Sequence, residues 1–189
     1  MRKYVLKWFN LGKVKDIYPV LREQNVSVSD KLFHQLKESG LYIFLDDQKG
    51  IIDIGEANPK GRALRNRIRN EVYDNSSFSQ KLSKLGMDKH AQLDLTVKVA
   101  TVEQGIDFNA PPEEIDGHLR LIERALICVT DPWSNSHGDI NKWRREEVEI
   151  VNLGDHDPLA PTIIRLKGKC PKKWVRVSAN PQALSTDPN

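Results

Sequence analysis

The sequence predicts a single domain of mixed α/β class, in which a small three-stranded antiparallel sheet is flanked by helices. Two short apolar runs, at 41–45 and 51–54, flank a polar stretch that ends in glycine, as in a β-hairpin. Residues 92–102 alternate between apolar and polar side chains, which predicts a third strand. Segments with the apolar spacing of helices lie on either side of this third strand, so helices are expected to cover the sheet.

The predicted hairpin contains two polar side chains that call for an explanation. Its strands are rich in β-branched and aromatic residues, and Asp46-Asp47-Gln48-Lys49-Gly50 has the composition of the turn. Asp53, however, lies inside the apolar run of the second strand, and Tyr42 lies near the start of the first. A carboxylate in an apolar run is costly to bury, so Asp53 is unusual for a strand that serves packing alone.

Two helices are predicted around the third strand. The first runs from about Arg62 to Tyr73, after the break at Pro59-Lys60-Gly61, and its apolar stripe is Leu64, Ile68 and Val72. The second opens at Pro111-Pro112-Glu113-Glu114, where proline and acidic residues favour a helix start, and runs to about Val129.

The remaining segments are predicted to be additions to this core. The chain begins with a predicted strand followed by helical material up to about residue 38. Short strands or ordered tail are expected at Val148–Leu153, Thr162–Leu166 and Trp174–Val177. With 189 residues, the chain suits one domain spanning 1–180, and the polar composition of 181–189 predicts a disordered tail.

Composition excludes a membrane-spanning chain and gives a default location. Hydrophobic residues make up 39% of the chain and charged residues 29%, and no apolar run approaches the ~20 residues that span a bilayer. The start of the chain, with Lys7 inside its apolar run, is typical of a strand and not of a signal peptide. Two cysteines, Cys128 and Cys170, are too few for a disulfide framework or a zinc site, so a cytoplasmic location is expected.

Basic residues gather in two stretches that contain no acid. The first, 57–70, holds Lys60, Arg62, Arg65, Arg67 and Arg69. The second, 165–176, holds Arg165, Lys167, Lys169, Lys172, Lys173 and Arg176. Such segregation suits a face that contacts phosphates, although a solvated surface is the alternative for either stretch. The expected nucleic-acid contacts are Lys60, Arg62, Arg65, Arg69, Lys172 and Lys173.

Glu123 is a candidate functional residue because of its neighbours on the second helix. Residues one turn away on the same face are apolar: Leu119, Leu126 and Ile127. A glutamate in such surroundings needs a cation, a metal or a hydrogen-bond network, because an unpaired buried charge is costly. A structural ion pair with a nearby arginine is the alternative.

Arg67 and Glu71 lie one turn apart at the edge of the apolar stripe on the first helix. One interpretation is a surface ion pair, which contributes only a few tenths of a kcal/mol. The other is an arginine held at the rim of the sheet to bond a phosphate with its planar guanidinium.

These residues together resemble the signature of the GIY-YIG nuclease superfamily. Gly40-Leu41-Tyr42 and Asp53-Ile54-Gly55 are similar to its two paired strand triplets. Residues 64–68 resemble the helix with the essential arginine, and residues 121–127 resemble the later helix with the metal-binding glutamate. Pro132 and Asn135 follow that helix as in many members. The resemblance covers about 39–136, and its parts occur in the family's order.

The resemblance implies a metal-dependent endonuclease that hydrolyses phosphodiester bonds in DNA, with duplex DNA the expected partner. Tyr42 would be the general base or would position the water, and Arg67 would neutralise charge on the scissile phosphate. Glu123 would hold one Mg²⁺ or Mn²⁺, and no organic cofactor or membrane is expected. For tyrosine to act as a base, the local field of metal and arginine must remove its proton.

Two residues depart from the family pattern and leave the activity open. Asp53 replaces a second tyrosine, so it is either a second carboxylate near the metal or the mark of a degraded site. Glu71 replaces a frequent histidine, and it could accept a proton or orient Tyr42. The alternative function is therefore a non-catalytic nucleic-acid-binding protein with the same fold, and a third is a general interaction domain. Specificity residues are expected in the additions, with Trp133, Trp143 and 165–176 as candidates.

Overall fold

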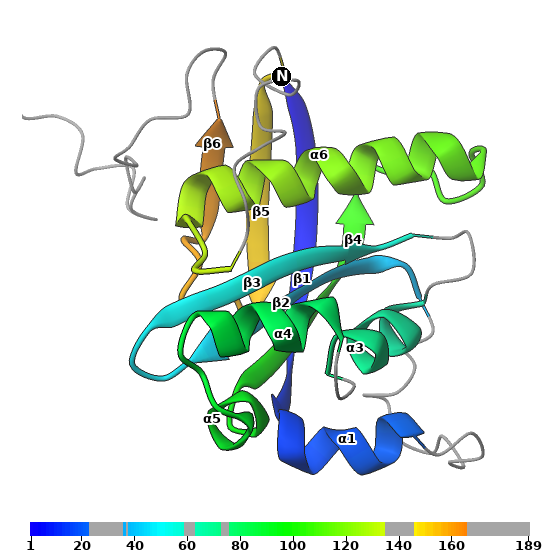
Figure 1. The fold of residues 1–189 in the computed structure, drawn as a ribbon. Helices are drawn as coiled ribbons and strands as arrows, with labels where there is room; N and C mark the ends of the chain where they lie inside the picture. Colours follow the sequence, from blue (N-terminus) through cyan, green and yellow to red (C-terminus); the bar gives the residue numbers. More distant parts are fainter. Residues whose placement is uncertain (23–35, 37, 59–62, 73–75, 135–145, 166–189) are drawn as a thin grey trace, which may run out of the picture.

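The structure of the protein is a computed structural model that describes residues 1–22, 36, 38–58, 63–72, 76–134 and 146–165 (Figure 1). The strands are β1 (Arg2–Lys13), β2 (Gly40–Asp46), β3 (Gly50–Ala57), β4 (Thr96–Gln104), β5 (Val148–Gly154) and β6 (Thr162–Arg165). The helices are α1 (Val14–Arg22), α3 (Leu64–Val72), α4 (Ser77–Lys84), α5 (Lys89–Leu93) and α6 (Pro112–Thr130). The predicted strand at 174–177 and the predicted tail at 181–189 lie outside the described residues.

The strands form one six-stranded mixed sheet in the order β3-β2-β4-β1-β5-β6. Neighbouring strands are antiparallel except β1 and β5, which are parallel. The mixed α/β class is therefore confirmed, but the predicted three-stranded sheet is wrong. The three expected strands are adjacent, as β3-β2-β4, and β1 extends this unit by pairing with β4.

Long-range pairing explains why the sheet is larger than the sequence indicated. Alternating polarity predicts that a segment is a strand, but it does not name the strand's partner. Arg2 at the start of β1 pairs with Val148 at the start of β5, so the two partners are separated by most of the chain. A parallel pair also needs a long connection, which leaves no local turn signal in the sequence.

Two helical layers cover the two faces of the sheet, as Figure 1 shows. On one face, buried side chains of α6 form a core with residues of β1, β2, β4 and β5. On the other face, α1, α3, α4 and α5 contribute to a second core with alternate residues of β2 and β4. The strand β3 forms one edge of the sheet and lies between the two layers.

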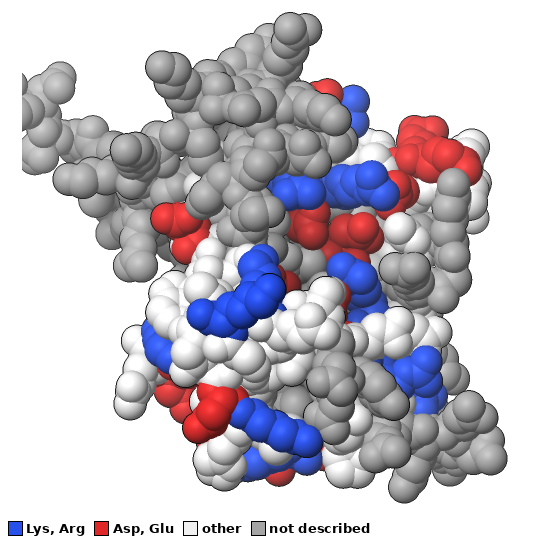
Figure 2. All heavy atoms as spheres, in the orientation of Figure 1, with Lys and Arg blue, Asp and Glu red and all other residues white. Residues whose placement is uncertain are grey.

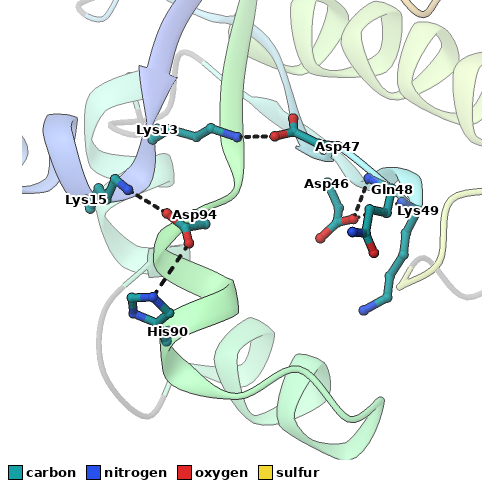
Figure 3. Close-up of polar contacts among 8 residues, drawn as sticks. All are labelled: Lys13, Lys15, Asp46, Asp47, Gln48, Lys49, His90 and Asp94. Carbon is teal, nitrogen blue, oxygen red and sulfur yellow. Dashed lines mark hydrogen bonds and ion pairs between the residues drawn. The ribbon is translucent and has the colours of Figure 1, made fainter.

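The hairpin prediction is confirmed by the contacts of its turn. The Asp46 side chain accepts hydrogen bonds from the backbone amides of Gln48 and Lys49, at 2.9 and 2.8 Å (Figure 3). Gly50 has φ +78°, a left-handed conformation that glycine adopts without strain. Lys13 and Asp47 add an ion pair between the turn and the end of β1.

A register shift in the hairpin accounts for the aspartate in its second strand. Phe44 pairs with Asp53, but the next residue, Leu45, pairs with Ile51, so Ile52 is the extra residue of a β-bulge. Ile52 consequently belongs to the core under α3, whereas Ile54 belongs to the core under α6. The bulge interrupts the alternation, and Asp53 lies in this interruption at the edge of the sheet.

The two predicted helices are present, and two short helices were not predicted. The helices α3 and α6 match the expected segments to within two residues at each end. The helix α4 starts at Ser76, whose hydroxyl accepts a hydrogen bond from the amide of Ser79. The helix α5 ends at Leu93, so it includes the first two residues of the strand predicted at 92–102. Within the described residues, no helix is long and apolar enough to cross a membrane.

Candidate functional site

A pocket of about 210 Å³ is lined by residues of β2, β3, α3, α4 and α6. All five predicted catalytic residues line it: Tyr42, Asp53, Arg67, Glu71 and Glu123. They come from β2, β3 and α3, which are consecutive in the chain, and from α6, which follows much later. Figure 2 shows acidic side chains in the band between α6 and the α3–α4 layer, with lysine and arginine side chains on both sides.

Tyr42 enters the pocket wall because its neighbour on β3 is a glycine. Tyr42 and Gly55 are directly paired between the strands, and a Cβ atom on residue 55 would overlap the Tyr42 ring and hydroxyl. The ring packs edge-on against Phe44, with centroids 5.6 Å apart, and the residue is 1% exposed. Its hydroxyl donates a long hydrogen bond of 3.4 Å to Glu71 Oε1. Gly55 therefore makes room for the tyrosine in the predicted motif.

Arg67 and Glu71 form an ion pair of 3.0 Å on α3, as their spacing predicted. The pair is not a simple surface contact, because the Glu71 side chain is only 11% exposed and shares its carboxylate with Tyr42. The Nε atom of Arg67 is buried, and it has no hydrogen-bond partner in the described part of the chain. One donor of this guanidinium is thus left for an acceptor that the described residues do not provide.

Asp53 is held by the chain that follows α6. The backbone amides of Trp133 and Ser134 donate to the carbonyls of Ile51 and Ile52, at 3.2 and 2.8 Å, and so extend along the edge of β3. This places the Ser134 hydroxyl where it donates to Asp53 Oδ1. Farther along β3, Gly55 borders the pocket.

Glu123 lies on α6 in the surroundings that the sequence predicted. Leu119, Leu126 and Ile127 are all buried, and the Glu123 side chain itself is 15% exposed. Its ion partner, Arg124, is 3.6 Å away, which is longer than a hydrogen bond. This geometry therefore does not favour the alternative of a tight structural ion pair.

Two acidic groups of the pocket, Asp53 and Glu123, hold their protons unusually strongly. Burial raises the pKa of Asp53 to about 7, with a further contribution from Glu71, against the opposing hydrogen bond from Ser134. Burial likewise raises the pKa of Glu123 to about 7, and the charges of Glu56 and Asp53 add to this against the nearby Arg124. Both carboxyl groups thus titrate close to neutral pH, which is common where function requires it.

The pKa of Tyr42 moves in the direction opposite to that expected of a base. Burial raises it well above its usual value, and the charges of Glu71 and Asp53 raise it further, while Arg67 opposes them. Burial lowers the pKa of Arg67, but Tyr42 and Glu71 outweigh burial and raise it. Arg67 alone therefore does not remove the Tyr42 proton, and the effect of a bound metal on it stays a prediction. Tyr42 is a neutral hydroxyl that donates to Glu71.

The donor set of the pocket fits a divalent cation that keeps some of its waters. The described residues contain no group of three or more histidine, cysteine, aspartate or glutamate side chains able to hold a metal. The pocket does contain three carboxylates: Glu71 is paired with Arg67, and burial destabilises the charged form of the other two, Asp53 and Glu123. Mg²⁺ is commonly held by one or two carboxylates together with waters and substrate phosphate.

Two residues at the pocket, Lys81 and Ser134, were not predicted from the sequence. Lys81 of α4 lines the pocket, and its charge acts to lower the pKa of Asp53. Lys81 lies one turn from Phe78 and next to Leu82, and both of these are buried. Its position beside this apolar stripe could have predicted a partly buried lysine. Ser134 follows Trp133, and it gained its role only through the pairing of this segment with β3.

The predicted nucleic-acid contacts are only partly described. Arg65 and Arg69 lie on α3, on either side of Arg67, and are half-buried. Lys60, Arg62, Lys172 and Lys173 lie outside the described residues.

Comparison of the chain with models of known protein families, with curated protein sequences and with solved structures finds no match.

Replacing Asp53 by asparagine should flatten the pH dependence of stability in the metal-free protein. The folded-state pKa is raised from 3.8 to about 7, so the folded protein binds the proton more tightly than the unfolded chain does. The stability that this proton provides is complete below pH ~4 and is lost as pH rises through ~7. In EDTA, the melting temperature of the wild type should fall between pH 5 and 8 more than that of Asp53→Asn. Asp47→Asn, at an exposed position of the same hairpin, should keep the wild-type slope.

Proposed function

We propose that the protein is a metal-dependent DNA endonuclease of the GIY-YIG type. The observation that carries the proposal is the convergence of Tyr42, Arg67 and Glu123 on one pocket together with Asp53 and Glu71. A cation, carboxylates and a hydroxyl in one hollow suit the hydrolysis of a phosphodiester, which needs charge neutralisation and proton transfer.

In this proposal Tyr42 and Glu71 act as a relay for the proton of the attacking water. The raised pKa of Tyr42 keeps its hydroxyl neutral, and its proton already points to Glu71 at 3.4 Å. The water gives its proton to the Tyr42 oxygen as the Tyr42 proton passes to the Glu71 carboxylate. Glu71, which stands where the resemblance leads one to expect histidine, is then the final acceptor. Tyrosine need not be deprotonated beforehand.

Arg67 is the proposed contact to the scissile phosphate. Its ion pair with Glu71 fixes one side of the guanidinium, and the side chain remains 33% exposed, so the guanidinium can also donate to a phosphate oxygen. Lys81 supplies a second positive charge in the pocket and offsets the negative charge of Asp53. These two cations offset the repulsion that a negative charge on Asp53 would exert on the substrate phosphate.

Glu123 is the proposed metal ligand, with Asp53 in the same pocket as a second carboxylate. When bound, Mg²⁺ or Mn²⁺ would polarise the phosphate and stabilise the leaving oxygen. The raised pKa values of the two carboxylates favour this assignment, because a cation relieves the cost of burying their charges. Ser134 holds Asp53 in a fixed orientation by its hydrogen bond.

The rival proposal is a nucleic-acid-binding protein without activity, and one observation favours it. The described residues lack a cluster of three metal ligands, so a degraded site would look similar.

The deciding experiment incubates the purified protein with phage and genomic duplex DNA in Mg²⁺, in Mn²⁺ and in EDTA. The nuclease proposal expects nicks or breaks that EDTA prevents. Binding of the same DNA without breaks under either metal would select the rival.

Arg65 and Arg69 of α3 should bind phosphates of the DNA outside the pocket. Removing one phosphate contact lowers the slope of log affinity against log salt by about 0.9 on duplex DNA, so Arg65→Gln with Arg69→Gln should lower it by about two. Fluorescence anisotropy in EDTA at several salt concentrations measures this slope. The matched control replaces Lys3 and Lys15, which are ion-paired to Glu149 and Asp94, and it should change the slope less. An equal slope in both double variants would remove α3 from the interface.

A further inference from the structure

A second hollow, of about 610 Å³, lies between the end of α6, the β2–β3 turn and the segment before β6. Its wall is largely apolar, with Ile51, Val129, Leu159 and Ile163 among the lining residues. Trp133 completes the wall from the chain that follows α6. The hollow is thus distinct from the pocket at Tyr42, and shares no lining residue with it among the described ones.

Trp133 is placed as a stacking surface. It is 45% exposed, although a tryptophan side chain gains much from burial. The ammonium group of Lys49 lies 4.7 Å from the centre of its ring, a cation–π contact that holds the ring in place. In Figure 3 the Lys49 side chain extends from the hairpin turn, away from Asp46. An exposed, oriented indole beside a lysine suits a planar aromatic ligand such as a nucleobase.

The charges around the hollow favour a base over a phosphate. Of the lining residues in the described part of the chain, Lys49 carries a positive charge and Asp131 a negative one. Lys49 is engaged with the Trp133 ring, and Asp131 adds a negative charge, so the described lining has no excess of positive charge for a phosphate. A carboxylate accepts hydrogen bonds from the exocyclic amino groups of bases. The wall therefore provides stacking and base-edge contacts in one place.

The hollow and the proposed active site are neighbours along β3. Ile51 lines the hollow and Asp53 lines the pocket, and the residue between them, Ile52, bonds the backbone of Ser134. At a rise of ~3.3 Å per residue these two positions are about 7 Å apart. Nucleotides on one strand of duplex DNA are spaced by ~3.4 Å, so the hollow is about two nucleotides from the pocket.

We propose that this hollow is a subsite for an unpaired nucleobase, which stacks on Trp133 while the same DNA strand passes the pocket at Tyr42. The inference rests on the proposed function for its placement relative to the cut, but base binding itself needs no catalysis. It implies that the protein prefers DNA with a bulged, flipped or single-stranded nucleotide near the cleavage position. Ordinary paired DNA cannot present a base face to the ring.

The test uses duplexes that carry one bulged 2-aminopurine, with the fully paired duplex for comparison, and is run in EDTA. Stacking on an indole quenches 2-aminopurine, so binding of the wild type should quench the bulged probe. Trp133→Ala should lose this quenching and bind the bulged duplex about tenfold more weakly. Trp133→Phe should retain part of both effects. Phe108→Ala is the matched control, because Phe108 is also 45% exposed but lies between β4 and α6.

The outcomes separate this inference from the nuclease proposal. The subsite is refuted if Trp133→Ala quenches and binds the bulged probe as the wild type does. It is also refuted if Phe108→Ala loses quenching and affinity as much as Trp133→Ala does. If the wild type cleaves DNA while Trp133→Ala binds the bulged probe normally, the function stands and the subsite falls. If the wild type never cleaves but quenching depends on Trp133, the subsite stands and the nuclease proposal falls.

Discussion

Tyr42→Phe should reduce cleavage by at least about 100-fold and leave the fold almost unchanged. Proton transfer by a positioned side chain contributes ~10²- to 10⁴-fold to a reaction, and the proposed relay from water to Glu71 passes through this hydroxyl alone. The ring, which packs against Phe44 and over Gly55, is retained in the variant. The hydrogen bond that the variant lacks is long, at 3.4 Å, so the stability cost is expected to be about 1 kcal/mol or less.

The chain offers a matched control for this experiment. Tyr4 is also fully buried, and its hydroxyl makes a short hydrogen bond of 2.7 Å to His118 Nδ1. Tyr4→Phe therefore removes an equivalent group that does not line the pocket. Initial rates on duplex DNA and thermal unfolding should be measured for both variants. Full activity in Tyr42→Phe would refute the relay, and equal losses in both variants would point to a general effect on folding.

The parts of the fold that could be predicted from sequence are those with local signals. The turn at Asp46–Gly50 has its own hydrogen bonds and a left-handed glycine, and α3 and α6 have complete apolar stripes. The pairing of β1 with β4 and β5 depends on contacts between residues far apart in the chain, so the sheet predicted from the sequence was too small. The short helix α5 has no buried residue, so no apolar stripe indicated it.

The candidate site divides in the same way. The residue types and their order led to Tyr42, Arg67 and Glu123, and these lie at one pocket. Their electrostatic state was not accessible from the sequence, because burial is the largest cause of the raised pKa of Tyr42, Asp53 and Glu123. Among the described residues the tyrosine therefore holds its proton, because burial and the charges of Glu71 and Asp53 outweigh Arg67. Ser134 became a partner of Asp53 only through tertiary structure.

Glu123→Gln should abolish metal-dependent cleavage and preserve DNA binding. A neutral amide keeps the shape of the side chain but is a much weaker ligand for Mg²⁺, which prefers charged oxygen donors. The predicted phosphate contacts on α3 are unchanged by this substitution, so affinity measured in EDTA should remain within about twofold of the wild type. Glu113→Gln, at the exposed start of the same helix, is the control and should cleave normally.

The same variant makes a second, independent prediction about stability. Burial raises the pKa of Glu123 from 4.5 to about 7, so at pH 8 the metal-free protein contains a buried charge whose cost the glutamine removes. In EDTA, Glu123→Gln should therefore melt a few degrees above the wild type at pH 8, and this advantage should shrink towards pH 5 as the wild-type carboxyl takes up its proton. Adding Mg²⁺ should raise the melting temperature of the wild type and not of the variant, because a ligand that binds the folded state stabilises it.

If the wild type cleaves and Glu123→Gln cleaves equally, the metal is held elsewhere, and Asp53 is the next residue to replace. If Mg²⁺ shifts both melting temperatures alike, Glu123 is not its ligand.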